Sequence, residues 1–205
     1  MAGHKILVIG AAGKSGSPIV RQAIARGFDV TAFVRHPEKA EGFPSQVRIV
    51  QGDGTDAASV AAAIPGHDTV VITVGGRTEF VSGPTARNAV AGMKAAGAKR
   101  IILLSAYGIG DSAHGLHGFV LSKVLSKLNA DKVASESALE SSGLDRTAVR
   151  APVLGEGPPQ GPLKAGVDIT INGFQTISRE DLATFIVDQI DSPTYVGKKP
   201  IVYPK

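Results

Sequence analysis

The chain has 205 residues, of which 43% are hydrophobic and 20% are charged, so it is neither disordered nor fibrous and can bury a substantial core. It contains no cysteine, which excludes disulfides, thiol nucleophiles and cysteine-ligated metals. Its net charge of +4 is dispersed and only 5% of its residues are aromatic, so we expect no nucleic-acid partner.

Short apolar runs rich in Val and Ile alternate with stretches of helical spacing through the first 150 residues. The runs predict six buried parallel strands, at Lys5–Ile9, Asp29–Val34, Val47–Gln51, Thr69–Val74, Arg100–Ser105 and Arg146–Arg150. Strands that alternate with helices imply right-handed crossovers. The predicted fold class is therefore α/β, a doubly wound parallel sheet with helices on both faces.

Start and stop signals place the helices between these strands. Pro18 suits a first helical turn and Gly27 a stop, and Asp56 can cap a short helix that ends before Pro65. A further helix is predicted at Ala86–Ala96. The stretch Leu116–Ser141 is predicted to be helical with a break near Asn129 and a stop at Gly143.

The last quarter of the chain begins with a Pro- and Gly-rich stretch, Gly155–Gly166, which predicts an irregular loop. Asn172-Gly173 then separates two apolar runs, Val167–Ile171 and Phe174–Ile177. An Asn-Gly pair between such runs favours a type I′ turn. We therefore expect a small C-terminal hairpin here.

A helix and a strand are predicted to complete the chain. Ser178, followed by Asp181 three residues later, resembles a capping box that opens a helix to about Gln189. Ile201–Tyr203 predicts a last strand. The sequence shows no internal repeat and no long linker, so we expect residues 1–205 to form one domain.

A glycine-rich string, GAAGKSG, lies between the first predicted strand and the first helix. A side chain at Gly10 would block the tight turn, one at Gly13 would hold backbone N–H groups away from a pyrophosphate, and one at Gly16 would separate helix from strand. The helix N-terminus then offers unpaired N–H groups to an anion. The string predicts a dinucleotide site, the alternative being a glycine-rich turn without a ligand. No Gly-Lys-Ser/Thr follows the last glycine, so a Walker-type phosphate loop is not expected.

The end of the second strand indicates which dinucleotide is bound. Arg35 stands where an NAD site usually has a carboxylate, and Lys39 lies one turn further on. A guanidinium suits a 2′-phosphate through paired charge-assisted hydrogen bonds. The predicted cofactor is therefore NADP(H), the alternative being a surface arginine without a ligand.

With these motifs the chain resembles the atypical short-chain dehydrogenase/reductase group with NAD(P)-binding Rossmann folds. Within that group it is similar to the biliverdin reductase B (flavin reductase) and NmrA-like branch. The resemblance covers nearly the whole chain, through GAAGKSG, VRHPEK, QGDGTD, GGRTEF, LLSA, SSGLDRTAVRAPVL and ISREDLATFI.

The resemblance implies a set of cofactor-binding residues near the ends of the strands. They are Gly10, Gly13, Lys14, Ser15 and Gly16 at the phosphates, Arg35 and Lys39 at the 2′-phosphate, Asp53 and Gly54 at the adenine, Gly75, Gly76 and Arg77 at the inner ribose and pyrophosphate, and Ser105, Pro152 and Val153 at the nicotinamide. From the residues alone, Asp53 is also consistent with a simple turn, Arg77 with a solvated loop arginine and Pro152 with the end of a strand.

Most members of the wider superfamily use a Tyr-x-x-x-Lys pair, in which the tyrosine exchanges a proton with a carbonyl oxygen. The chain has one such string, from Tyr195 to Lys199. It follows Pro193, contains a glycine and falls beyond the last predicted helix, whereas the pair belongs on the helix after the fifth strand. We interpret the string as a coincidence and do not expect conventional alcohol or ketone chemistry.

The flavin reductase branch does without that tyrosine. Its enzymes hold the nicotinamide ring against a flat conjugated acceptor, so proximity supplies most of the rate and the proton comes from solvent. Val153 stands where that branch usually has a histidine. Ser105 is the predicted catalytic residue, as a hydrogen-bond donor to the carboxamide or to the acceptor, with a capped strand end as the alternative.

Lys132 is the second predicted catalytic residue. It lies with Lys123 on the helical segment after the fifth strand, where solvated surface lysines are the alternative. Lys132 is preferred because Asp131-Lys132 followed by Glu136 recurs in NmrA-like relatives of the chain.

Two segments, residues 107–119 and 155–178, are expected to cover the substrate. Tyr107 and His117 are the predicted substrate contacts. His114 and His117 are spaced for a metal, but no third ligand stands near them, so no metal site is expected.

The leading functional hypothesis is an NADPH-dependent reductase that passes hydride to a flavin, a quinone-like ring or a bilin-like conjugated acceptor. The alternative is an NmrA-like redox sensor that binds NADP without turnover. A sugar-nucleotide epimerase is disfavoured because too few residues follow the sixth strand. No apolar run reaches the ~20 residues of a membrane span and no signal-peptide layout is seen, so we expect no membrane partner and a cytoplasmic monomer or small homo-oligomer.

Overall fold

The computed structural model describes residues 3–75, 79–112, 126–171 and 175–205. In these ranges the main sheet has the strand order β3-β2-β1-β4-β5-β6-β10-β8. Its strands are β1 (Lys5–Ile9), β2 (Asp29–Val34), β3 (Arg48–Gln51), β4 (Thr69–Ile72), β5 (Arg100–Ala106), β6 (Asp145–Ala151), β8 (Leu163–Gly166) and β10 (Ile201–Pro204). Neighbouring strands are parallel except β10 and β8. The order reverses between β1 and β4, which confirms the doubly wound sheet.

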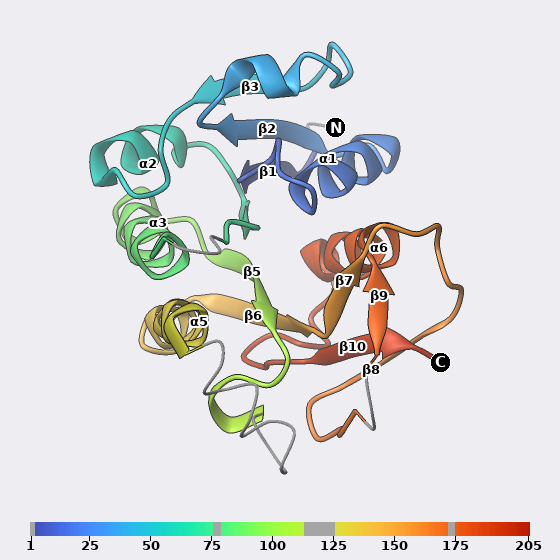
Figure 1. The fold of residues 1–205 in the computed structure, drawn as a ribbon. Helices are drawn as coiled ribbons and strands as arrows, with labels where there is room; N and C mark the ends of the chain where they lie inside the picture. The colour runs from blue at the N-terminus through green and yellow to red at the C-terminus, as the bar shows by residue number, and fades with distance from the viewer. Residues whose placement is uncertain (1–2, 76–78, 113–125, 172–174) are drawn as a thin grey trace.

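Helices cover both faces of this sheet (Figure 1). α1 (Gly16–Ala25) and α6 (Arg179–Asp191) lie on one face, and α2 (Ala57–Ala63), α3 (Ser82–Ala96) and α5 (Ser126–Glu140) lie on the other. Because strand side chains alternate, Ile6 and Val8 of β1 enter the core beneath α1 and α6, while Leu7 enters the core beneath α2 and α3. The two-sided burial explains why the strands are continuous apolar runs.

Two of the predicted helix caps are confirmed. The Asp56 carboxylate accepts a hydrogen bond from Ala58 N at 3.1 Å and opens α2. Ser178 Oγ accepts from Asp181 N at 3.0 Å and opens α6. The Asp181 carboxylate also accepts from Gln160 N at 2.7 Å, so this cap holds the preceding loop against the helix.

α3 begins at Ser82, four residues before the predicted start. Its first N–H groups are capped by a side chain distant in sequence. The Asp131 carboxylate in α5 accepts from Val81 N at 3.2 Å, from Ser82 N at 2.9 Å and from Gly83 N at 2.8 Å. A cap supplied by another helix leaves no local signal in the sequence.

The break predicted near Asn129 is wrong, because α5 runs through that residue without interruption. Asparagine is only a modestly poor helix former, and the packing of α5 against α3 outweighs its propensity. Residues 116–125 of the predicted segment lie outside the described residues. The helix ends before Gly143, which has the positive φ of a stop signal at 74°.

The predicted C-terminal hairpin is wrong in its pairing. β9 (Thr176–Ser178) runs parallel to β7 (Val153–Gly155) in a separate two-stranded sheet. Residues 167–171 form no strand, and Asn172-Gly173 lies outside the described residues. A single-sequence turn signal is overridden where a distant strand offers a better pairing.

Part of the predicted irregular loop is also a strand. Leu163–Gly166 forms β8, which pairs with the outer edge of β10. The prolines of this stretch all precede β8, so none of them removes a ladder hydrogen bond. The last helix and the last strand, β10, are confirmed near their predicted positions.

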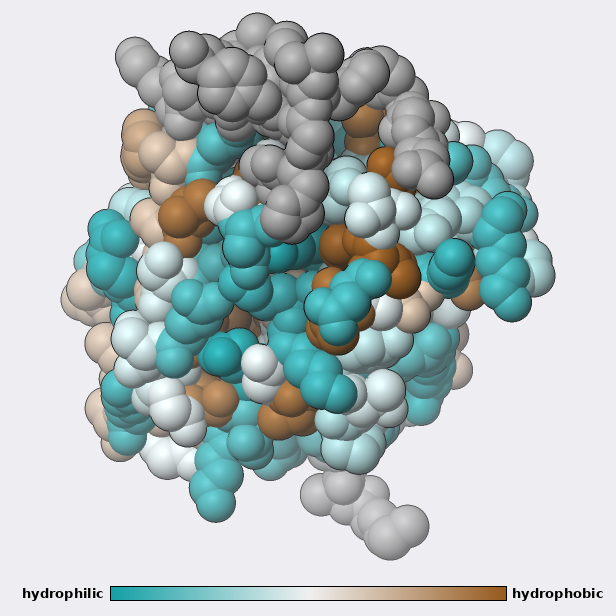
Figure 2. All heavy atoms as spheres, turned by 90° about the horizontal axis from the view of Figure 1, so that it is seen from below, coloured by the Kyte–Doolittle hydropathy of each residue, from teal (hydrophilic) through white to brown (hydrophobic). Residues whose placement is uncertain are grey.

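The surface carries scattered apolar side chains. Within the described ranges, no helix is both long and apolar enough to cross a membrane. The exposed large hydrophobic residues there are Ile49, Phe80, Val133, Val153 and Val167. On the face in Figure 2, outside the grey atoms, hydrophobic residues form small groups among hydrophilic ones. Such scatter is typical of an ordinary protein surface.

Candidate functional site

A cleft of about 950 Å³ lies at the carboxyl ends of the parallel strands, where the strand order reverses. This is the place at which doubly wound sheets bind ligands. Many of the sequence-predicted site residues line it: Gly10, Gly13, Lys14, Ser15, Arg35, Lys39, Asp53, Gly54, Gly75, Ser105, Lys132 and Pro152. The fold thus brings residues from the ends of six strands, β1 to β6, to one cavity.

The other predicted site residues lie elsewhere. Gly16 is buried behind the loop that lines the cleft. Val153 is 57% exposed on β7 and does not line the cleft. Tyr107 also lies outside the lining, and its hydroxyl accepts a hydrogen bond from Ile171 N at 3.3 Å. Gly76, Arg77 and His117 lie outside the described residues.

The glycine-rich loop is shaped by close backbone contacts. Gly10 has a φ of +86°, a backbone conformation that is strained for residues with a side chain, and a Cβ there would lie 2.9 Å from Thr73 Oγ1. A Cβ on Gly16 would lie 2.2 Å from Gly10 O and 2.8 Å from Ala11 Cα, so α1 can start against the loop only because residue 16 is glycine. The N-terminus of the ten-residue helix α1 is thereby held at the cleft, where it favours an anion.

Lys14 connects this loop with the opposite wall of the cleft. Its Nζ lies 2.8 Å from Glu156 Oε1, which is 3.1 Å from Arg179 Nη1. Hydrogen bonding to Lys14, with the nearby charges of Lys14 and Arg179, holds the pKa of Glu156 below its ordinary value. A carboxylate therefore sits between two cations beside the glycine-rich loop.

Arg35 and Lys39 are exposed cations on the wall formed by the end of β2. Asp53 faces the same part of the cleft, and its Oδ1 accepts from Thr55 N and Thr55 Oγ1, both at 2.8 Å. The backbone hydrogen bond from Thr55, the hydroxyl of Thr55 and the charge of Arg35 together lower the pKa of Asp53. Asp53 thus closes a turn and stays an ionised acceptor in the cleft.

Lys132 is buried at the floor of the cleft, below Gly75. Its Nζ donates to Val74 O at 3.0 Å, to Leu104 O at 3.0 Å and to Ser82 Oγ at 3.3 Å. An ammonium has three donors, so these contacts use all of them. They tie the ends of β4 and β5 to α3. Burial lowers the pKa of Lys132 to about 8, although Asp131 and Glu136 nearby favour its charge.

Ser105, the penultimate residue of β5, lies at the same floor and is hydrogen-bonded to a buried ion pair. Its Oγ donates to Glu136 Oε1 at 2.5 Å. Arg150 of β6 donates from Nε to the same oxygen at 3.0 Å and from Nη2 to Glu136 Oε2 at 2.6 Å. Glu136 and Arg150 are buried, and a paired fork of this kind satisfies both charges.

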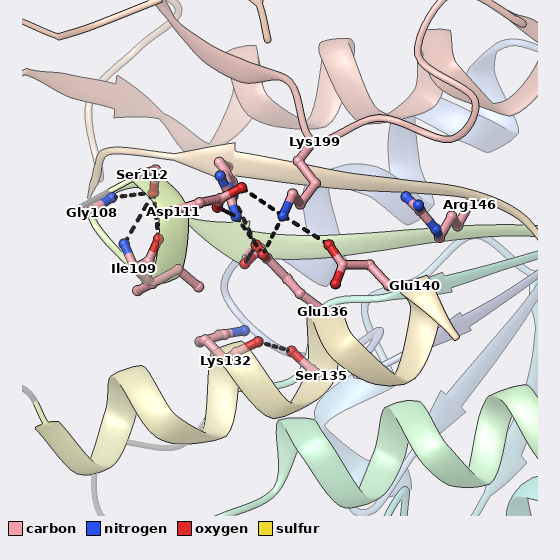
Figure 3. A network of polar contacts seen from close by, with 12 residues as sticks. Gly108, Ile109, Asp111, Ser112, Lys132, Ser135, Glu136, Glu140, Arg146 and Lys199 are labelled. Atoms are coloured by element: carbon pink, nitrogen blue, oxygen red, sulfur yellow. Dashed lines mark hydrogen bonds and ion pairs between the residues drawn. The ribbon is translucent and has the colours of Figure 1, made fainter. Parts of the chain in front are cut away.

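The ion pair extends toward the surface through further charges (Figure 3). Arg150 also pairs with Asp111, and Lys199 lies 2.9 Å from Asp111 and 2.8 Å from Glu140. Burial of Arg150 by itself would lower its pKa. Its hydrogen bonds with Glu136 and, to a smaller extent, with Asp111 outweigh this effect and raise the pKa. Asp111 is thereby fixed to β6 just before the segment at residues 113–125.

Sequence reasoning missed Glu136, Arg150 and Asp111 as members of the site. The signal that could have found them is Arg150, a charged residue inside an apolar strand, which requires a buried partner. Glu136 lies one helical turn after Lys132, so both point to the same side of α5.

Tyr195 and Lys199 do not form a reacting pair at the cleft. Tyr195 lies in a turn before β10, and its ring packs 5.8 Å from that of Phe185. Neither residue lines the cleft, and the Lys199 ammonium is paired with carboxylates. The interpretation of this string as a coincidence agrees with the structure.

No group of three or more His, Asp or Glu side chains able to hold a metal occurs in the part of the chain that the structure describes. His114 and His117, which share a suggestive spacing, lie outside that part.

Comparisons with known proteins indicate the ligand of this cleft. A family model described as NAD(P)H-binding matches residues 10–193. A phenylcoumaran benzylic ether reductase from Ginkgo biloba is 28% identical, with 97% of this chain and 68% of that protein aligned. An uncharacterized chloroplastic protein from Arabidopsis thaliana is also 28% identical, over 91% of this chain and 71% of its own length. The structure of ChuY, described as an anaerobillin reductase from Escherichia coli O157:H7, has a TM-score of 0.83 and 26% identity, with 97% and 96% of the two chains covered.

Proposed function

Because the chain belongs to the NAD(P)H-binding family, we propose that it is an NADPH-dependent reductase that transfers hydride to a flavin, a quinone-like ring or a bilin-like conjugated acceptor. The observation that carries this proposal is the composition of the cleft wall around Ser105. The described lining includes the mainly apolar residues that flank Ser105 and Lys132 at the ends of β4, β5 and β6, namely Val74, Gly75, Leu104, Ala106, Ala151, Pro152 and Leu154. Such a wall suits a flat ring and offers no tyrosine as a proton donor.

The two ends of the cleft receive different parts of the coenzyme in this proposal. Arg35 follows the end of β2 and Ser105 lies next to the end of β5. These strands are three positions apart in the sheet, about 14 Å at ordinary strand spacing. We assign Arg35, with Lys39, to the 2′-phosphate, Asp53 to the adenine and the glycine-rich loop to the pyrophosphate. The nicotinamide then lies over Ser105 and Pro152.

The reaction in this proposal depends on placement rather than on acid catalysis. Bound NADPH supplies the hydride. Ser105 and Pro152 orient the ring, apolar residues exclude water from its face, and the acceptor takes its proton from solvent. Since the donors of Lys132 are used by Val74, Leu104 and Ser82, we assign Lys132 to holding the floor rather than to touching the acceptor.

The remaining expectations stay predictions. These are the one-domain organisation of residues 1–205, the covering of substrate by residues 107–119 and 155–178 with contacts from Tyr107 and His117, a monomer or small homo-oligomer, and a cytoplasmic location.

The test is the loss of NADPH absorbance in the presence of FMN, a quinone and biliverdin in turn. Turnover of at least one acceptor, with NADPH preferred over NADH, is expected. Binding of NADPH with no turnover of any acceptor contradicts the reductase proposal.

That outcome would favour the second candidate, an NmrA-like redox sensor that binds NADP without turnover. The complete use of the Lys132 donors by the protein favours this candidate, because it leaves no ammonium hydrogen for an acceptor. A sensor should bind oxidised and reduced coenzyme with clearly different affinities, which calorimetry measures directly.

A further inference from the structure

The Ser105 hydroxyl has a fixed direction. A serine carries one donor hydrogen and two acceptor lone pairs. Glu136 accepts from Ser105 Oγ at 2.5 Å, the short length typical of an O–H group on a carboxylate. Arg150 donates to both oxygens of Glu136, and a carboxylate held in this way can only accept. The single hydrogen of Ser105 therefore points away from the cleft.

We propose that Ser105 acts on the ligand only as a hydrogen-bond acceptor and that Glu136 is the positioning residue that makes it so. This assignment rests on the proposed function and deepens it. It replaces the expectation from the sequence that Ser105 donates to the carboxamide or to the acceptor. Ser105 lines the cleft, and among the described residues no group donates to its hydroxyl oxygen, so its lone pairs are left for a ligand. The donors of Lys132 go to other acceptors.

A hydrogen-bond acceptor at this point selects a ligand that presents an N–H group. One source is the carboxamide of the nicotinamide ring. The other is a ring N–H of the hydride acceptor, which flavins and bilins have and quinones lack. The substrate class favoured by the second source is thus a nitrogen-containing conjugated ring.

The first experiment compares calorimetric binding of NADP⁺ with that of its 3-acetylpyridine analogue, in which a methyl group replaces the carboxamide –NH₂. The preference is the affinity for NADP⁺ divided by the affinity for the analogue. If the carboxamide donates to Ser105, this preference should be about tenfold larger in the wild type than in Ser105→Ala, which corresponds to one hydrogen bond. Ser105→Thr keeps the hydroxyl and should retain the preference.

Glu136→Gln tests the positioning role, because a glutamine has one oxygen and cannot accept all three hydrogen bonds that the carboxylate takes from Ser105 and Arg150, so the hydrogen of Ser105 is no longer held away from the cleft. The preference for NADP⁺ should fall in this variant as in Ser105→Ala. Glu140→Gln is the matched control: Glu140 pairs with Lys199 at 2.8 Å and does not line the cleft, so the preference should be kept. If Glu136→Gln fails to fold, the Ser105 variants decide.

The second experiment measures KM for FMN and for a quinone in Ser105→Ala. If the KM for FMN rises about tenfold, while the KM for the quinone and the coenzyme preference stay unchanged, the partner of Ser105 is the ring N–H of the hydride acceptor, and the proposal is supported. Unchanged coenzyme preference and unchanged KM values overturn it, while leaving the reductase proposal intact. A wild type that binds no NADP⁺ contradicts the proposed function itself.

Discussion

The two ends of the cleft are built in opposite ways. At the Arg35 end, the cations Arg35 and Lys39 are exposed and the chain supplies a backbone cradle for an anion. At the Ser105 end, Lys132, Glu136 and Arg150 are buried and hydrogen-bonded to the protein. Exposed charges remain available to a ligand, whereas buried charges must be satisfied within the fold. One end therefore offers exposed positive charge to a ligand, whereas the charges at the other end are paired within the protein.

The substitution of arginine by methionine should change the free energy of unfolding strongly at the Ser105 end and hardly at all at the Arg35 end. Arg150→Met leaves the buried Glu136 carboxylate without its paired fork and should lower the free energy of unfolding by about 4 kcal/mol. Arg35→Met removes an exposed cation and should change it by less than about 0.5 kcal/mol. Urea unfolding measures both. The double variant Arg150→Met with Glu136→Leu should recover most of the loss, and equal losses for the two single variants would contradict the comparison.

Lys132 should make stability depend on pH in alkaline solution. Its pKa is lowered from 10.5 to about 8 in the folded protein, so between these values the unfolded chain binds more protons. The stability of the wild type relative to Lys132→Met should therefore rise with pH across this window, by a total on the order of 3 kcal/mol. Urea unfolding at several pH values is the measurement. A difference that stays constant with pH would show that the ammonium keeps its ordinary pKa.

Arg35→Asp should act on the coenzyme rather than on the fold. NADPH binding should weaken about 100-fold, because charge-assisted hydrogen bonds to the 2′-phosphate are lost and a repulsive carboxylate is added. NADH binding should change far less. Arg48→Asp, an exposed arginine on β3 outside the cleft lining, is the matched control. Equal weakening of both coenzymes by Arg35→Asp would remove the 2′-phosphate assignment.

Tyr195→Phe should have the smallest effect. The phenylalanine keeps the ring contact with Phe185, and the hydroxyl lies outside the cleft lining. Acid–base catalysis by a tyrosine contributes at least 100-fold, so a rate within about twofold of the wild type excludes such a role. A collapse of the rate in a folded variant would restore the Tyr–Lys pair.

The sequence predicted the Arg35 end better than the Ser105 end for a physical reason. Glycine spacing and a strand-end arginine are local patterns that follow from one turn and one strand. The Asp131 cap of α3 joins residues 48 and 49 positions apart, beyond any local window. The Glu136–Arg150 pair is 14 residues apart but joins a helix to a strand, so its contact follows from the packing of α5 on the sheet and not from a local pattern. The C-terminal errors have the same origin, because β8 and β9 each pair with a strand that is not their neighbour in sequence.

Asp111 and Asp131 stand on either side of residues 113–125, and each is anchored in the fold: Asp111 to Arg150 and Lys199, Asp131 to the start of α3. The side chains on both sides of these residues are thus held by contacts with other elements of the fold. Under the proposed function, we therefore expect grafts of other sequences at residues 113–125 to change which acceptor is reduced and to leave the affinity for the coenzyme unchanged.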